Sequence, residues 1–335
     1  MEPSILPDEE LTALYKRELR PVLHRFAREG RARLSKVLKW AAFLGLVALF
    51  LAFILSQMAP GTVAPFVPFV GVLLFMGIGY ARAHSGYRDR YKEQVIRPII
   101  GHFDAGLTYS PDRSITRGDF DAADLFRQDI DRFRGEDLVE GQVGETRIRF
   151  SEVHAQDRQQ RGSGKNRRTE WVTVFKGLFV IVDFPKQFRG RTVVLPDTAQ
   201  RLLGGLGQTL QSMNFTRGQL VKLEDPEFER LFVVHGDDQV EARYLLSTSL
   251  MQRIVDFRKK YQHDIYLSFA HSQLHMALPS SRNLLEPPQL LQLLSYGRSS
   301  ASEQAVLSRI GEYVTDLKMV LGIVEDLNLN RRIWG

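Results

Sequence analysis

The chain has 335 residues, a formal net charge of +6 and no cysteine. The lack of cysteine excludes disulfide bonds and thiolate metal sites, and it fits a cytoplasmic environment. Much of the basic excess flanks two apolar stretches, where anionic lipid headgroups attract it, so the charge gives little support for nucleic acid and we expect no nucleic-acid partner.

Residues 1–39 are expected to form an N-terminal cytoplasmic helix. From residue 8 onward, apolar side chains recur mostly every three or four positions among charged ones, which is the pattern of an amphipathic helix. Pro21 has no backbone N–H group, so it should kink or restart this helix.

Two uncharged apolar stretches follow, at residues 40–58 and 63–80. As helices, each would be roughly 27–29 Å long, close to the ~30 Å hydrocarbon core of a bilayer. The link at residues 59–62 reads Ala-Pro-Gly-Thr, which favours a tight turn. The pattern predicts a transmembrane helical hairpin over residues 40–80. The alternative is a hairpin buried in a soluble core, whereas a signal peptide would place its apolar region closer to the N-terminus.

The basic residues predict the orientation of this hairpin. Lysine and arginine are enriched on the cytoplasmic side of membrane spans, and the connecting link carries no charge. Both termini should therefore be cytoplasmic and the link should lie outside. The flanking cations are Arg25, Arg28, Arg31, Arg33, Lys36 and Lys39 before the first stretch, and Arg82, Arg88, Arg90, Lys92 and Arg97 after the second.

Residues 81–103 are expected to form a stalk helix, with apolar side chains at four-residue spacing. Its Arg97-Pro98 repeats the Arg20-Pro21 of the first helix, and each pair is followed five residues after the proline by phenylalanine. Two helices that leave a tight turn run antiparallel. We therefore expect the stalks to pair, to bend near the two prolines, and to place Phe26 close to Val95.

Residues 104–335 are expected to form a cytoplasmic α+β domain of antiparallel sheet plus helices. Predicted strands come in hairpins instead of alternating with long helices, which disfavours a doubly wound parallel sheet. The region is either one domain or two β-plus-helix units of about residues 104–215 and 216–335.

The pattern of residues within this domain places its elements along the chain. Strands are predicted near residues 144–154, 171–184, 191–196, 219–224, 231–238, 265–270 and 273–279. Helices are predicted near residues 120–126, 197–213, 239–261 and 302–329. Residues 155–170 are expected to be a polar, flexible loop.

One long string, residues 221–257, carries a resemblance. Its marks are Glu224-Asp225-Pro226, Phe228, Asp237-Asp238-Gln239 and the run Glu241-Ala-Arg-Tyr-Leu-Leu, in that order. The string resembles an uncharacterised family of bacterial membrane proteins, the domain of unknown function family 3137. The similarity covers most of residues 125–334 together with the preceding hairpin. It implies a bacterial inner-membrane protein, and it supplies no activity, ligand or catalytic residue.

The clearest candidate site is a basic cluster in the predicted loop. Its members are Arg158, Arg161, Lys165, Arg167 and Arg168. The run Gly162-Ser-Gly-Lys165 superficially resembles a phosphate-binding loop. It lacks that motif's first glycine and its Ser or Thr after the lysine, and it precedes a strand instead of a helix. The alternatives are a solvated loop tip and a contact with anionic lipid or an acidic partner.

Other polar groups have simpler structural explanations. Asp237 or Asp238 fits a helix N-cap, with Glu241 in capping-box position, and Glu224-Asp225-Pro226 fits a turn before a short helix. The final strands could bring together His263, His271 and His275, but without the spacing of a helical zinc motif. The sequence has no serine-hydrolase, cysteine-nucleophile or zinc-protease signature, so we expect neither a metal nor a cofactor.

These observations favour a membrane-anchored, non-catalytic cytoplasmic binding module at the bacterial inner membrane. Its partners would be membrane lipids and a protein partner or a second copy of the chain. Two other functions stay open: a subunit of a transport or envelope-maintenance complex, and a membrane-tethered enzyme with an unrecognised site. The absence of charge within either apolar stretch disfavours transport.

Overall fold

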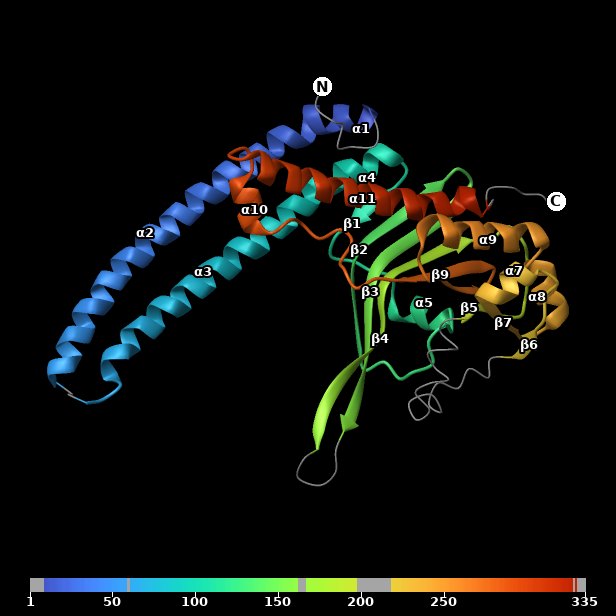
Figure 1. Cartoon of the computed structure of the whole chain (residues 1–335), viewed down its shortest axis with the longest axis horizontal. Helices are drawn as coiled ribbons and strands as arrows, with labels where there is room; N and C mark the ends of the chain where they lie inside the picture. The colour runs from blue at the N-terminus through green and yellow to red at the C-terminus, as the bar shows by residue number, and fades with distance from the viewer. Residues whose placement is uncertain (1–8, 59–60, 162–166, 198–217, 328, 330–335) are drawn as a thin grey trace. The chain divides into compact units, whose positions relative to one another are not determined.

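The computed structural model describes residues 9–58, 61–161, 167–197, 218–327 and 329 (Figure 1). They divide into two compact units. The first comprises residues 1–99 and 286–313, and the second comprises residues 100–285 and 314–335. Helix α11 (Ser300–Asp326) contributes residues to both units.

The first unit is helical, as the apolar periodicity predicts. In chain order its elements are α1 (Glu9–Leu14), the π-helical turn η1 (Tyr15–Leu19), α2 (Arg20–Met58), the 3-10 turn η2 (Ala64–Phe66), α3 (Val67–Tyr91), the π-helical turn η3 (Lys92–Ile96), α4 (Arg97–Phe103, which ends in the second unit), α10 (Leu290–Ser295) and the first part of α11. By length and composition, the continuous helices Glu10–Met58 and Ala64–Phe103 could each cross a membrane. Large apolar side chains between residues 40 and 80 are exposed, among them Leu46, Phe50, Phe66 and Leu73.

The two Arg-Pro pairs mark the same local structure. The backbone N–H of Arg20 donates to the carbonyl of Tyr15, and that of Arg97 donates to the carbonyl of Lys92, five residues back instead of four. Each wide turn ends directly before an Arg-Pro pair, next to a position where proline already removes an α-helical bond. Such turns are a recognised cause of helix bending, so the interruptions lie where the sequence predicts bends.

The stalk segments of α2 and α3 contact each other through Phe26. Its ring lies 6.3 Å from that of Tyr87 and 6.4 Å from that of Tyr91, measured between ring centroids. Glu29 forms an ion pair of 2.9 Å with Arg90, whose guanidinium also lies over the Phe26 ring. The ring of Phe26 therefore contacts Tyr87 and Tyr91, which lie one to two helical turns closer to the second apolar stretch than Val95, the neighbour predicted from the sequence.

The second unit is built on a sheet. Within the described residues its strands are β1 (Thr108–Ser110), β2 (Arg132–Val143), β3 (Thr146–Arg161), β4 (Arg168–Asp183), β5 (Thr192–Pro196), β6 (Gln219–Val221), β7 (Phe232–Gly236), β8 (Tyr266–Ala270) and β9 (Gln273–Pro279). They form one sheet in the order β1-β2-β3-β4-β9-β8-β5-β7-β6, and every neighbouring pair is antiparallel. Strands from both halves of the expected domain therefore join a single sheet, and the α+β class is confirmed.

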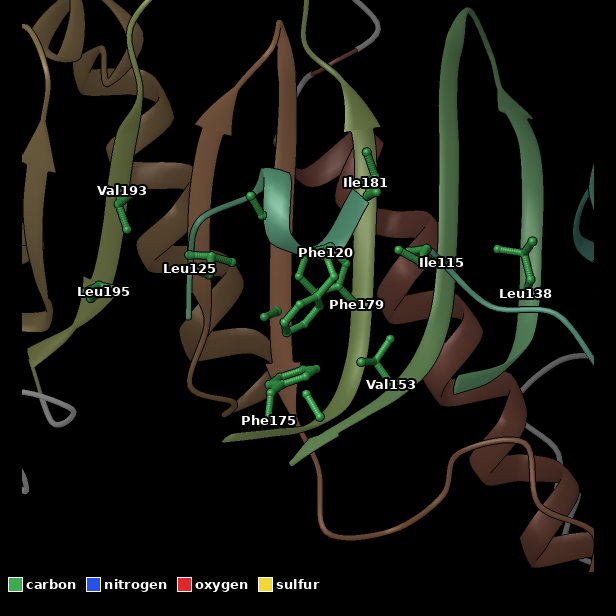
Figure 2. Packing of buried hydrophobic residues seen from close by; sticks show 13 residues of the cluster. Ile115, Phe120, Leu125, Leu138, Val153, Phe175, Phe179, Ile181, Val193 and Leu195 are labelled. Carbon is green, nitrogen blue, oxygen red and sulfur yellow. The ribbon is translucent and has the colours of Figure 1, made fainter. Parts of the chain in front are cut away.

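One face of this sheet is covered by α5 (Arg117–Ala122) (Figure 2). Figure 2 shows Phe120 of α5 over Phe179 and Phe175 of β4, and the Phe120 and Phe179 ring centroids are 4.9 Å apart. The buried cluster extends across the sheet to Val193 and Leu195 of β5. Helix α9 (Thr248–Tyr261) and the part of α11 that belongs to this unit lie on the opposite face, where Arg253 of α9 donates to the backbone carbonyl of Asp326.

Several predicted boundaries are wrong. The expected loop over residues 155–170 is largely strand, since β3 continues to Arg161 and β4 begins at Arg168. The expected helix over residues 239–261 is two helices, α8 (Gln239–Leu245) and α9, separated at Leu246 and Ser247. The short helix near residue 120 begins and ends earlier, as α5. The pattern also missed β1, the start of β2, and α10, while the expected helix over residues 197–213 lies mostly outside the described residues.

Local capping signals are confirmed more often. Asp225 accepts hydrogen bonds from the backbone of Glu227 and Phe228 and so begins α7 (Pro226–Leu231). Asp238 caps α8 by accepting from Val240 and Glu241. Glu241 does not complete a capping box, because its carboxylate accepts instead from the backbone N–H groups of Arg189 and Gly190.

Candidate functional site

Strands β3 and β4 extend beyond their neighbours in the sheet. β2 begins at the pair Arg132 with Gln156, and β9 ends at the pair Pro279 with Gly177. In the described part of the chain, residues 157–161 and 168–172 therefore pair only with each other. They form a two-stranded ribbon, which Figure 1 shows as the long pair of arrows leaving the sheet. We call this segment the β3–β4 ribbon.

The register of the ribbon separates the predicted basic residues. Arg158 pairs with Trp171, and Arg161 pairs with Arg168. Side chains alternate between the faces of a strand, so Arg158 belongs to one face and Arg168 belongs to the other. Arg167 is exposed immediately before β4, whereas Lys165 lies outside the described residues.

Arg158 shares its face with cations that sequence reasoning missed. The rows of this face are Arg158 with Trp171, Arg132 with Gln156, and Arg134 with His154 and Lys176. The Arg132 guanidinium lies 3.9 Å from the centroid of the Trp171 ring. We call this set, Arg132, Arg134, His154, Arg158, Trp171 and Lys176, the basic patch. The alternation of side chains along β3 and β4 could have revealed this patch. It was missed in part because residues 155–170 were predicted to be a loop.

The basic patch has a net positive field. Burial lowers the pKa of His154 first, and the neighbouring cations Lys176, Arg134 and Arg132 lower it further. No described carboxylate forms an ion pair with the side chain of Arg134 or Arg158. Trp171 is 37% exposed, so an aromatic ring and several cations face solvent together.

Cations on the α5 face of the sheet differ in this respect. Arg149 lies 3.4 Å from Asp119, and Arg191 pairs with Asp124 and Asp237. Those charges are already neutralised within the fold. The basic patch is therefore the stronger candidate for a surface that binds an anion.

The other predicted groups are dispersed. His263 and His271 are exposed, while His275 is 2% exposed in β9 beside Phe179. Burial lowers the pKa of His275 to about 4, so this imidazole is neutral at pH 7. Among the described residues, no three His, Cys, Asp or Glu side chains are grouped closely enough to hold a metal ion.

Residues 173–329 match the model of a family described as "Protein of unknown function (DUF3137)". The match confirms the resemblance to a domain of unknown function over most of β4, the following strands and all of α11. No curated protein and no solved structure matches the chain.

Proposed function

We propose that the protein is a membrane-anchored, non-catalytic binding module whose basic patch binds anionic phospholipid headgroups at the bacterial inner membrane. The observation that carries the proposal is the cluster of cations around an exposed tryptophan, in which no described carboxylate forms an ion pair with the side chain of Arg134 or Arg158. In this proposal residues 40–80 span the membrane as a hairpin and both termini are cytoplasmic.

The helical unit supports the anchor. Two helices of sufficient length expose Leu, Phe and Val side chains over residues 40–80, and such a surface is stable only when another apolar phase covers it. An anchor also keeps the rest of the chain close to headgroups, which raises their effective concentration at any basic surface.

The composition of the basic patch favours headgroups as the anion. Tryptophan beside arginine is suited to the membrane interface, where the ring lies among apolar groups and the cation lies near phosphate. Each basic residue near an anionic surface contributes ~1 kcal/mol, so the four permanent cations would supply ~4 kcal/mol. That free energy corresponds to roughly a thousandfold in affinity.

The test uses the full chain in nanodiscs of phosphatidylcholine, mixed with separate vesicles that contain phosphatidylglycerol. We expect the wild type to bind these vesicles and the R134S/R158S variant to bind roughly 30-fold more weakly, because two cations are lost. Binding should also weaken as salt rises, since screening shortens the reach of exposed charges. A variant with serine at Arg161, Lys165, Arg167 and Arg168 tests the basic cluster that the sequence analysis places in a loop.

The matched control is R230S/R243S, which removes the same charge from exposed positions on α7 and α8. It should bind like the wild type if the location of the charge matters. If both double variants bind the vesicles equally weakly, binding depends on the net charge of the chain and not on the location of the basic patch. Binding of an acidic protein from the same membranes, with no binding to anionic vesicles, would show that the patch recognises a protein instead.

A further inference from the structure

A cavity of about 160 Å³ lies within the helical unit, between α2, α3 and α10. Most of its lining is apolar, and it includes Phe26, Leu34, Met76 and Leu294, while Arg33 and Arg90 also reach it. For comparison of size, an enclosed apolar cavity of about 150 Å³ binds benzene. The space therefore suits about six carbon atoms.

Glycines shape this cavity. A Cβ atom at Gly30 would lie 2.4 Å from the end of the Leu294 side chain, so a larger residue there would require that side chain to shift. Gly79 on α3 and Val37 on α2 both line the cavity, and a Cβ atom at Gly79 would make ordinary contact with the Val37 side chain at 3.7 Å. A larger side chain at Gly79 would extend into the space that the two helices leave between them.

The position of the cavity relates it to lipid. Its lining joins the last turns before residue 40 to the last turn of the second apolar stretch, at Met76, Gly79 and Tyr80. Leu38 is 51% exposed and Met76 is 38% exposed, so the cavity is continuous with the outward apolar surface. Tyr87, buried and donating a 3.1 Å hydrogen bond to the carbonyl of Pro288, lies at the other end of the lining.

The two arginines at the cavity are not equivalent. Arg90 is held by Glu29 at 2.9 Å and lies over the Phe26 ring. Arg33, in contrast, makes no ion pair with any residue that the structure describes. A cation beside an apolar space matches a molecule with an acyl chain and a phosphate, in which the chain enters the cavity and the phosphate meets Arg33.

We infer that this cavity is a binding site for one anionic phospholipid at the cytoplasmic boundary of the membrane. The inference rests on the proposed membrane anchor, and it is independent of the basic patch, which lies in the other unit. It assigns a specific lipid to the helical unit, whereas the patch is proposed to contact a surface of many headgroups.

Native mass spectrometry of the full chain, released from nanodiscs of phosphatidylcholine and phosphatidylglycerol, tests the site. We expect the wild type to retain one phospholipid after other lipids are stripped. G79L should reduce that occupancy at least about fivefold, because its side chain occupies the cavity. The matched control G77L makes the same substitution at an exposed position of α3 with open space around it, and it should retain the lipid.

A second variant keeps the proposal testable if G79L folds poorly. R33Q leaves the cavity intact, so it should still retain phosphatidylcholine while losing about fivefold in preference for phosphatidylglycerol, which corresponds to ~1 kcal/mol for one cation. R25Q on the same helix is its control. The proposal is overturned if the stripped wild type carries no lipid, if it is a lipid-free dimer, or if G77L loses as much lipid as G79L. Failure of the anchor itself would appear separately, as release of the chain from membranes at alkaline pH.

Discussion

At the residue scale, the most unusual group in the second unit is Glu152. Its carboxyl accepts hydrogen bonds from the backbone N–H groups of Leu284, at 2.6 Å, and Leu285, at 3.0 Å. Burial raises its pKa to about 7, and the nearby Asp137 carboxylate adds to the rise. Asp137 is itself buried and accepts from the Tyr109 hydroxyl. Near neutral pH, Glu152 is therefore divided between its acid and its anion.

This shift makes stability depend on pH. The folded state binds the Glu152 proton more tightly than the unfolded state, so its stabilising contribution is complete below pH 4.5 and is lost as pH rises through about 7. An E152Q variant keeps an acceptor oxygen without the charge. Relative to the wild type, it should gain roughly 3 kcal/mol between pH 5 and pH 8, since one pKa unit corresponds to 1.36 kcal/mol.

Thermal unfolding of the detergent-solubilised chain, followed by circular dichroism at several pH values, measures this difference. E145Q, at the exposed turn between β2 and β3, is the control for the loss of one carboxylate elsewhere in the chain. His275 acts in the opposite direction: its pKa is lowered, so its contribution is present above pH 6.5 and is lost as pH falls through about 4. A pH-independent gap between E152Q and the wild type would contradict the assignment.

Residue-level prediction succeeded where partners are local. Asp225 and Asp238 cap helices by accepting from N–H groups two and three residues later, and that spacing is visible in the sequence. The partners of Glu152 lie more than 130 residues away, so no local pattern marks it. The same holds for the basic patch, because Lys176 and Arg134 become neighbours only through strand pairing.

At the element scale, the long helices were predictable because their apolar periodicity runs over many turns. The β3–β4 ribbon was not, since its polar side chains on both faces resemble a solvated loop and its stability comes from cross-strand pairs. The apolar pattern continues through Leu246, which hid the separation of α8 from α9. Ser247, a residue type favoured at the N-cap, was an available local signal, although its side chain makes no capping hydrogen bond.

The stalk pairing can be tested directly, because the chain has no native cysteine. Glu29 and Arg90 are joined by an ion pair, so the double variant E29C/R90C should be joined in membranes by a short, reducible thiol crosslinker. The register expected from residue counting, F26C/V95C, should crosslink less efficiently, because Phe26 faces Tyr87 and Tyr91. Mobility on denaturing gels, with and without reductant, measures both.

The control for this test is E29C/K16C, whose two sites lie on the same helical stretch but several turns apart. It should give no crosslink. Efficient crosslinking of F26C/V95C with none for E29C/R90C would place the stalks in the register predicted from the sequence, about one turn away from that of the structure.

At the scale of the whole molecule, composition indicated the α+β class, but the strand order could not be read from it. β4 pairs with β9 across about 90 residues, and β5 lies between β8 and β7. Such pairings depend on which faces can be buried together, and the sequence shows only that each strand is apolar. The orientation in the membrane, unlike the strand order, is proposed from the sequence alone, because it depends on the number of charged residues on each side of the apolar stretches.

We expect both termini to be cytoplasmic. Basic residues flank both apolar stretches and the link between them has none, and cations resist transfer across the inner membrane. Reporter fusions at Ser4 and Gly335 should therefore read as cytoplasmic, whereas a reporter inserted at Thr62 should read as periplasmic. Four lysines added to the link should lower the fraction of chains with that insertion in the periplasm, because the charge difference that sets the orientation is reduced. A periplasmic signal from either terminal fusion would rule out the hairpin orientation, and with it the headgroups that the basic patch is proposed to meet.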